Sequence, residues 1–143
     1  MRPPPARRRL PGWPERLADI IDAHRDTPFA WGTHDCCLFA AAVVAALTGH
    51  DPAAGYRGAY ATEAEAEALI GPGGLPGFLA QQAAAAGLPQ LPHPSQAQRG
   101  DLALVTVGNT PLLGVVLGDL VAAPGTDGLA FVPAGTATMG WAV

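Results

Sequence analysis

The segment from Cys36 to Thr48 constrains the fold more than any other part of this 143-residue sequence. Its residues, CCLFAAAVVAALT, carry no charge and are apolar at almost every position. A helix that is apolar on every face must be covered on all sides. We therefore predict a central helix over residues 35–48, which Gly49 ends. The run is shorter than the roughly 18 residues of a membrane span, so we expect no span.

Three further helices are predicted around the central one. The first, over residues 14–24, carries apolar side chains at helical spacing: Leu17, Ile20, Ile21 and His24. Thr62 and Glu65 form a capping box that starts a short helix, and Gly71 ends that helix. Another helix lies between Pro76 and Gly87.

After about residue 100, short runs rich in Val and Leu alternate with turn-forming segments such as 118–119 and 124–128. This pattern predicts an antiparallel meander, with strands over residues 102–107, 112–117, 120–123 and 129–132. Helices followed by strands indicate one α+β domain, over residues 12–143, in which the buried helix lies on the sheet.

Charge separates an N-terminal arm, residues 1–11, from an acidic body. All eight cations are Arg and six lie in the first 25 residues, whereas residues 26–143 hold two Arg and nine acids. Such a body has no basic face, so we expect no nucleic-acid binding. The arm is rich in Arg and Pro and lacks the apolar stretch of a signal peptide. We expect other protein chains to order it; the alternative is that Arg7, Arg8 and Arg9 fold back onto the body.

The residues 29–37 carry most of the chemical information. They place Cys36 at the first turn of the central helix, where unpaired N–H groups and the helix dipole favour a thiolate. A cysteine hydrolase needs such a thiolate together with a base, usually His. The alternative interpretation is that Cys36 and Cys37 are small core residues. A disulfide between neighbours is rare, so we expect free thiols.

Residues 29–49 resemble the nucleophile segment of NlpC-type peptidoglycan endopeptidases, a papain-like group of cysteine hydrolases. Trp31-Gly32 and Asp35-Cys36 match their Trp-Gly-Gly and Asp-Cys-Ser-Gly elements, with Cys37 where Ser is usual. Residues 98–104 and 113–118 resemble the first two core strands of that family. The resemblance implies a papain-like fold with Cys36 as the candidate nucleophile.

The chain is also similar to a family of small, uncharacterised phage and prophage proteins of the same superfamily. Three motifs carry this similarity: Gly-x-x-Asp-Cys at 32–36, Thr-Gly-x-Asp-Pro at 48–52 and Tyr-Arg-Gly-x-Tyr at 56–60. Trp141 near the end of the sequence fits as well. Such proteins are encoded among tail genes. The resemblance therefore implies a virion tail protein, assembled in the bacterial cytoplasm, that binds other tail-tip proteins through its arm and has peptidoglycan as a further candidate partner.

The resemblance breaks at the catalytic base. Leu112-Leu113 stands where the enzymes of that family carry their catalytic His, and leucine cannot accept a proton. His93, in a Pro-rich loop before the strands, is a candidate replacement. His24 is expected to pack on the apolar face of its helix and His50 to be solvated. His34 directly precedes Asp35-Cys36, and the direction of the chain there disfavours a productive contact with Cys36.

These observations favour a structural or adaptor protein of the tail tip whose active site is degenerate. The first alternative is an active cysteine peptidase or amidase that cleaves peptidoglycan peptides with Cys36. The second is a toxin-like or cell-wall-binding module.

No cofactor or metal is expected. His34, Cys36 and Cys37 crowd a single turn and cannot surround a tetrahedral ion. The glycines at 71–74 lack the Lys-Ser/Thr of a phosphate-binding loop. Asp101, within Arg99-Gly100-Asp101, is expected to bond nearby backbone groups.

Overall fold

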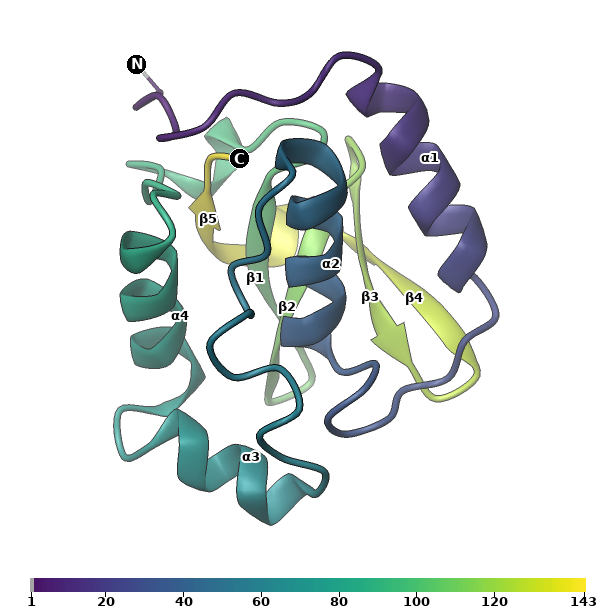
Figure 1. Cartoon of the computed structure of the whole chain (residues 1–143), viewed down its shortest axis with the longest axis vertical. Coiled ribbons are helices and arrows are strands. Elements are labelled where there is room, and N and C mark those ends of the chain that lie inside the picture. Colours follow the sequence, from purple (N-terminus) through teal and green to yellow (C-terminus); the bar gives the residue numbers. More distant parts are fainter. Residues whose placement is uncertain (1) are drawn as a thin grey trace.

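The computed structural model describes residues 2–143 and shows an α+β domain of four helices and five strands (Figure 1). The helices are α1 (Trp13–His24), α2 (Cys36–Thr48), α3 (Glu63–Ile70) and α4 (Gly74–Ala85). The strands are β1 (Leu102–Val107), β2 (Thr110–Val116), β3 (Leu120–Gly125), β4 (Gly128–Pro133) and β5 (Ala137–Trp141). Two 3₁₀ turns, η1 (Pro94–Gln96) and η2 (Ala134–Thr136), flank the sheet strands. The α+β class and the four helices confirm the sequence predictions.

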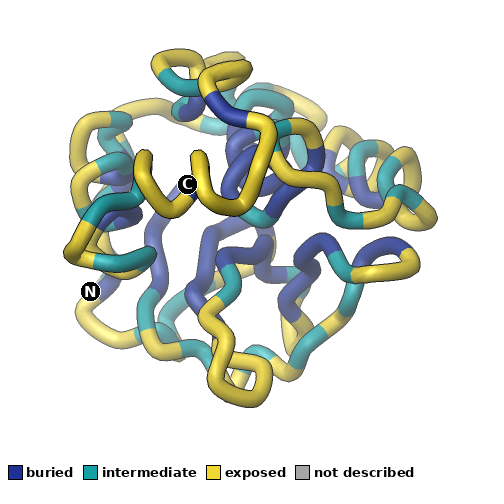
Figure 2. Tube along the Cα trace, turned by 90° about the horizontal axis from the view of Figure 1, so that it is seen from below, coloured by how far each residue is buried: buried dark blue, intermediate teal, exposed yellow. Residues whose placement is uncertain are grey.

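Helix α2 lies at the centre of the domain, as its uniformly apolar sequence predicts. It rests on the sheet through β2 and β3, and α1 packs beside it (Figure 1). Gly49 ends it in a left-handed conformation, with a φ of 78°. Buried residues run through the middle of the trace, whereas exposed residues occupy the outer turns (Figure 2). No helix among residues 2–143 is long and apolar enough to cross a membrane.

The sheet is antiparallel, with the strand order β4-β3-β2-β1-β5. The first four strands form the predicted meander. Strand β5 was not predicted; it returns to pair with β1, with an irregularity in register between Leu104 and Val105. Trp141 at the end of β5 is fully buried in the core below α2. The segment 137–141 is only five residues long and includes Gly140, so its alternation of Ala137, Met139 and Trp141 with smaller residues is a weak strand signal, and its position depends on pairing with a distant strand.

The two faces of the sheet have different covers. The face toward α2 contributes Leu104, Leu113 and Val115 to the main core. The opposite face forms a second apolar cluster that includes Val105 and Val121, flanked by η2 and by the segment after η1. The sheet therefore separates the surroundings of α2 from a smaller layer behind it.

The N-terminal arm runs along its own domain, next to the end of β5 (Figure 1). The Ala6 N–H donates to the Gly87 carbonyl at 2.9 Å, and the Leu10 N–H donates to the Leu47 carbonyl at 2.7 Å. The arm therefore folds back onto its own domain, which is the alternative given above and not the expectation that other protein chains order it. The reason is ionic: Arg2 and Arg9 both reach the buried carboxylate of Asp101.

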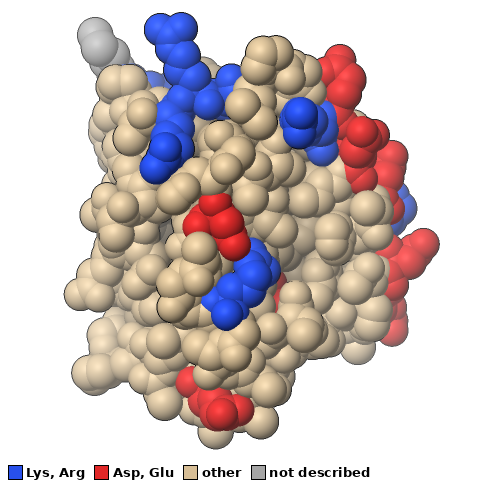
Figure 3. All heavy atoms as spheres, in the orientation of Figure 1, with Lys and Arg blue, Asp and Glu red and all other residues tan. Residues whose placement is uncertain are grey.

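Charges are distributed unevenly over the face shown in Figure 3. Basic side chains gather at the upper edge, along the arm, and acidic side chains follow the right-hand edge, over α1. Arg7 and Arg8 are exposed. The structure thus leaves two cations of the arm at the surface, while Arg2 and Arg9 are used inside the domain.

Candidate active site around Cys36

Asp35 fixes the start of α2 and so positions Cys36. Its Oδ1 accepts a hydrogen bond from the Leu38 N–H at 3.0 Å, which caps the helix. Its Oδ2 accepts one from the Gly32 N–H at 3.0 Å and another from the Tyr60 hydroxyl. The side chain is buried, and the loop, the helix and a distant tyrosine all meet at this one carboxylate. Cys36 follows as the first residue of α2, as predicted.

Gly32 cannot carry a side chain in this loop. Its φ of +79° is unfavourable for residues with a Cβ, and a Cβ here would overlap the carbonyl oxygen of Tyr60. The glycine of the Gly-x-x-Asp-Cys motif therefore has two roles. It donates to Asp35, and it lets the segment of Tyr60 approach the start of α2.

Another loop, held by an ion pair, supports Tyr56 and Tyr60. Arg57 donates from Nε to Asp51 Oδ2 at 2.9 Å and from Nη2 to Oδ1 at 3.2 Å. The Arg57 guanidinium lowers the pKa of the Asp51 carboxyl, which also accepts from the Ala53 N–H. This pair holds the turn from which Tyr56 and Tyr60 extend toward Cys36. Hydrogen bonds and the ion pair thus link residues 32–36, 48–52 and 56–60 into one site.

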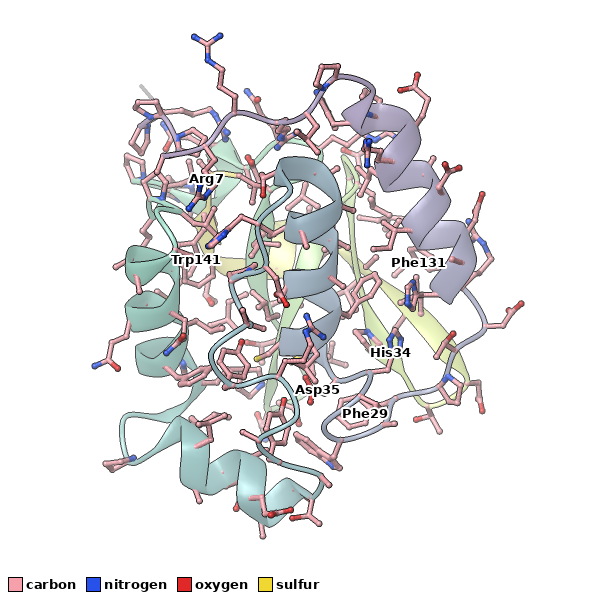
Figure 4. All side chains as sticks on the ribbon, in the orientation of Figure 1. Arg7, Phe29, His34, Asp35, Phe131 and Trp141 are labelled. Carbon is pink, nitrogen blue, oxygen red and sulfur yellow. The ribbon has the colours of Figure 1, made fainter. Side chains whose placement is uncertain are left out.

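A cavity of about 270 Å³ opens beside Cys36. It lies between the start of α2, the start of β2, α3 and the start of α4, and its walls are mainly aromatic and aliphatic: Phe29, Trp31, Tyr56, Tyr60, Leu69, Ile70, Leu75, Phe78 and Leu112. Figure 4 shows Asp35 at the lower end of α2, with Phe29 beneath it. The thiol therefore faces a space that a ligand can occupy.

The two neighbouring thiols differ in acidity. A hydrogen bond from the Cys37 thiol lowers the pKa of Cys36, and the Leu113 N–H adds to this, while burial and the Asp35 charge oppose it. The pKa of Cys37 is raised because its thiol donates to Cys36 and is itself buried. Both cysteines are free, Cys36 is half-buried, and Cys37 faces the core, as predicted. The arrangement favours a thiolate on Cys36.

A model of the family described as Domain of unknown function (DUF6950) matches residues 8–143. The chain belongs to the DUF6950 family. The match includes every helix and strand of the domain and the whole of the Cys36 site. No curated protein and no solved structure matches the chain.

In this DUF6950 protein the two histidines nearest α2 lie away from the cavity. The ring of His34 stacks on His24, with 5.1 Å between centroids, and contacts Phe39 edge-on. His34 is buried, which lowers its pKa, and the neighbouring His24 lowers that pKa further. The partly buried His24 is fixed by a 2.9 Å hydrogen bond between Nδ1 and the Ile20 carbonyl. The expectation that His24 packs is confirmed, and His34 is held by ring contacts with His24 and Phe39 and is not among the residues that line the Cys36 cavity.

The other two histidines are exposed. His50 follows the far end of α2, as expected. His93 caps η1: its Nδ1 accepts from the Ser95 N–H at 3.1 Å and lies 2.7 Å from Ser95 Oγ. The structure does not bring His93 to the residues that line the Cys36 cavity.

Leu112 and Leu113 lie where the resemblance places the base. Strand β2 passes the start of α2, the Leu113 N–H points to the Cys36 thiol, and Leu112 lines the cavity. Among residues 2–143, no group of three or more His, Cys, Asp or Glu side chains could hold a metal ion.

Tyr56 and Tyr60 are site residues that residue-by-residue reasoning missed. Burial raises the pKa of both, and for Tyr60 the hydrogen bond to Asp35 raises it further. Their only signal in the sequence is the Tyr-Arg-Gly-x-Tyr motif, which the resemblance to tail-gene proteins had already singled out.

Proposed function

We propose that this DUF6950 protein is a structural or adaptor component of a phage or prophage tail tip, built on a papain-like, NlpC-type domain with a degenerate active site. The proposal combines two elements. A cysteine sits at the start of a buried helix that lies on an antiparallel sheet, and no histidine of the described residues lines the cavity beside that cysteine to act as its base.

The observation that carries the proposal is the pair of leucines beside the thiol. Hydrolysis of an amide needs a group that takes a proton from the nucleophile and later delivers one to the leaving amine. Such help is worth about 10²- to 10⁴-fold in rate. Leu112 and Leu113 offer neither, and no histidine of the described chain, residues 2–143, lines the cavity.

The tail-tip assignment is supported by the three motifs shared with small tail-gene proteins. These motifs surround one site: Gly32 and Tyr60 meet at Asp35, and Asp51 pairs with Arg57. Two proteins with the same fold are expected to share residues that are distant in sequence but in contact in the structure, as these motifs are. The exposed Arg7 and Arg8 supply the charged surface through which the arm would contact an acidic tail protein.

The second candidate is an active cysteine peptidase or amidase that acts on peptidoglycan peptides. One observation favours it: hydrogen bonds from Cys37 and from the Leu113 backbone lower the pKa of Cys36, which favours the nucleophilic thiolate. In this case the N–H groups at the start of α2 would stabilise the oxyanion.

Incubation with cell-wall sacculi separates the two functions. We expect purified protein to release no more peptide than its Cys36→Ala variant does. Release that disappears in Cys36→Ala but survives in Cys37→Ala would establish the enzyme instead.

Co-expression with the neighbouring tail proteins tests the adaptor role. The wild type and Cys36→Ala should both co-sediment with assembled tails, because the thiol has no part in assembly. A protein that stays outside the particles would contradict the tail-tip assignment.

A further inference from the structure

The walls of the Cys36 cavity are strongly apolar for a site that faces a thiol. Aromatic rings come from the loop before α2, from the turn after it and from α4, and aliphatic side chains come from α3. The cavity measures about 270 Å³. An apolar protein cavity of roughly 150 Å³ accepts benzene, so this one has room for a group larger than a benzene ring.

The charges around the cavity are all of one sign. Its two carboxylates are Asp35 and Glu63, and no Arg, Lys or His of the described residues lines it. The nearby Arg57 guanidinium is already bound in a bidentate pair with Asp51. A ligand that carried a carboxylate into this space would meet negative charge in a partly desolvated site, with no cation to balance it.

Two polar side chains of the wall, Asp35 and Tyr60, are engaged within the protein. Asp35 accepts from Gly32, from Leu38 and from the Tyr60 hydroxyl, so that hydroxyl is directed away from a ligand. A group that enters is therefore held mainly by apolar contact.

The apolar surface continues outside the cavity. Few large apolar side chains of the domain are exposed, but Trp31 (37% exposed) and Leu69 (38% exposed) both border this opening. Exposed apolar side chains that border a cavity are a mark of binding surfaces.

We infer that the Cys36 cavity binds an uncharged apolar group, larger than a benzene ring, and holds it against the Cys36 thiol. The inference rests on the proposed function only in taking this site as the functional one, and it names the class of ligand that the site admits. It requires no hydrolysis. A peptidoglycan fragment would then bind through a neutral, apolar portion and not through its carboxylates.

Thiol-reactive probes of different charge and size test this inference on the intact protein. We would measure the alkylation rate at Cys36, located by peptide mass spectrometry, for N-benzylmaleimide against N-ethylmaleimide and for iodoacetate against iodoacetamide. Each ratio is divided by the same ratio for N-acetylcysteine, which removes the effect of thiol pKa. We expect the benzyl preference to be raised about tenfold or more, because the additional apolar carbons are buried. We expect the iodoacetate ratio to be lowered.

Matched variants locate the cause of these preferences. Trp31→Ala should reduce the benzyl preference, whereas Phe131→Ala, which removes an equally exposed aromatic side chain on β4, should leave it unchanged. Glu63→Gln should raise the relative rate of iodoacetate.

Ratios in the wild type equal to those of N-acetylcysteine would overturn the inference, even if the Trp31 variant failed to fold. Equal effects of the Trp31 and Phe131 variants would overturn it too. Hydrolysis of sacculi would overturn the adaptor function without changing the probe ratios, so the two failures are distinguishable.

Discussion

Asp35 and Asp101 are both buried aspartates, but they are stabilised by different partners at opposite ends of the domain. Asp101 accepts from two guanidinium groups, Arg2 Nη1 at 2.6 Å and Arg9 Nη2 at 3.0 Å, and from the backbone N–H groups of Gln98 and Val143. Asp35 accepts only from neutral donors. One negative charge is balanced by cations of the arm, and the other is held by dipoles alone.

Asp101 therefore belongs to a structural junction, whereas Asp35 belongs to a site whose charge affects a reactive thiol. At Asp101 the balanced charge joins the arm, the start of β1 and the end of β5. At Asp35 the unbalanced charge acts on its neighbours: it raises the pKa of Cys36 and of Cys37. The helix cap therefore opposes the thiolate that Cys37 and Leu113 favour. This opposition limits how far the pKa of the Cys36 thiol is lowered.

Removal of Asp101 should give the largest effect on stability. Asp101→Ala leaves the two arginines and two backbone N–H groups without their acceptor, and loss of one partner of a buried ion pair costs about 3 kcal/mol or more. Urea denaturation measures this as a lower free energy of unfolding. Asp119→Ala, at an exposed turn, is the control. If both variants unfolded at the same urea concentration, Asp101 would not be a structural junction.

Removal of one of the two cations should have a smaller effect than removal of Asp101. Arg9→Ala loses the pair with Asp101, hydrogen bonds to the Arg99 and Val143 oxygens, and the stacking of its guanidinium over Trp13 at 4.2 Å. We expect a loss of about 2 kcal/mol, from charged hydrogen bonds that are partly exposed to solvent. Thermal unfolding should show this loss, while Arg8→Ala should match the wild type.

The same reasoning applies to deletion of the arm. Without residues 1–11 the thermal midpoint should fall, because Asp101 loses both of its cations. An unchanged midpoint would mean that the arm contributes nothing to the isolated domain, and that its role lies wholly in contacts with other proteins.

At the other aspartate, loss of one neutral donor should have a smaller effect. Tyr60→Phe removes the hydroxyl that donates to Asp35, a hydrogen bond to a charged group worth about 1.5 kcal/mol. Tyr56→Phe is the control on the same cavity wall. Chemical denaturation of both variants tests the ranking, which is contradicted if Tyr60→Phe costs as much as Asp101→Ala.

The smallest effect concerns acidity. In Asp35→Asn the side chain can still cap α2, but the charge that raises the pKa of Cys36 is gone. The pKa of Cys36 should therefore fall, and the pH profile of its alkylation by iodoacetamide should move to lower pH. The rate at neutral pH should rise by less than about tenfold. A profile that moves to higher pH would show that the Asp35 charge favours the thiolate.

Local signals predicted the helices well. Thr62 caps α3 by accepting from the Glu65 N–H, although the Glu65 carboxylate accepts from the Ala61 N–H and the Thr62 hydroxyl and not from the Thr62 N–H of a full capping box. Gly49 ends α2 in the left-handed conformation that glycine tolerates. Such signals act within a few residues, so one sequence is enough to reveal them. The apolar uniformity of α2 likewise predicted its central position.

Contacts between residues distant in the sequence could not be predicted from the sequence. Strand β5 exists because it pairs with β1, and the alternation of apolar residues over its five residues is too short a signal to mark a strand by itself. The arm binds a carboxylate about a hundred residues away in the chain and, as a Pro- and Arg-rich segment, it has the composition of a solvated tail. Tyr60 meets Asp35 only because Gly32 lets two loops approach closely.

The junction at Asp101 also determines how the molecule can be attached to anything else. Arg2 and Val143 contact the same carboxylate, so both ends of the described chain leave from one point (Figure 1). The Cys36 cavity opens at the other end of α2, roughly 20 Å away at the rise of a 13-residue helix. A tether or a fused protein at either end would therefore attach near Asp101, at the end of the domain opposite the cavity.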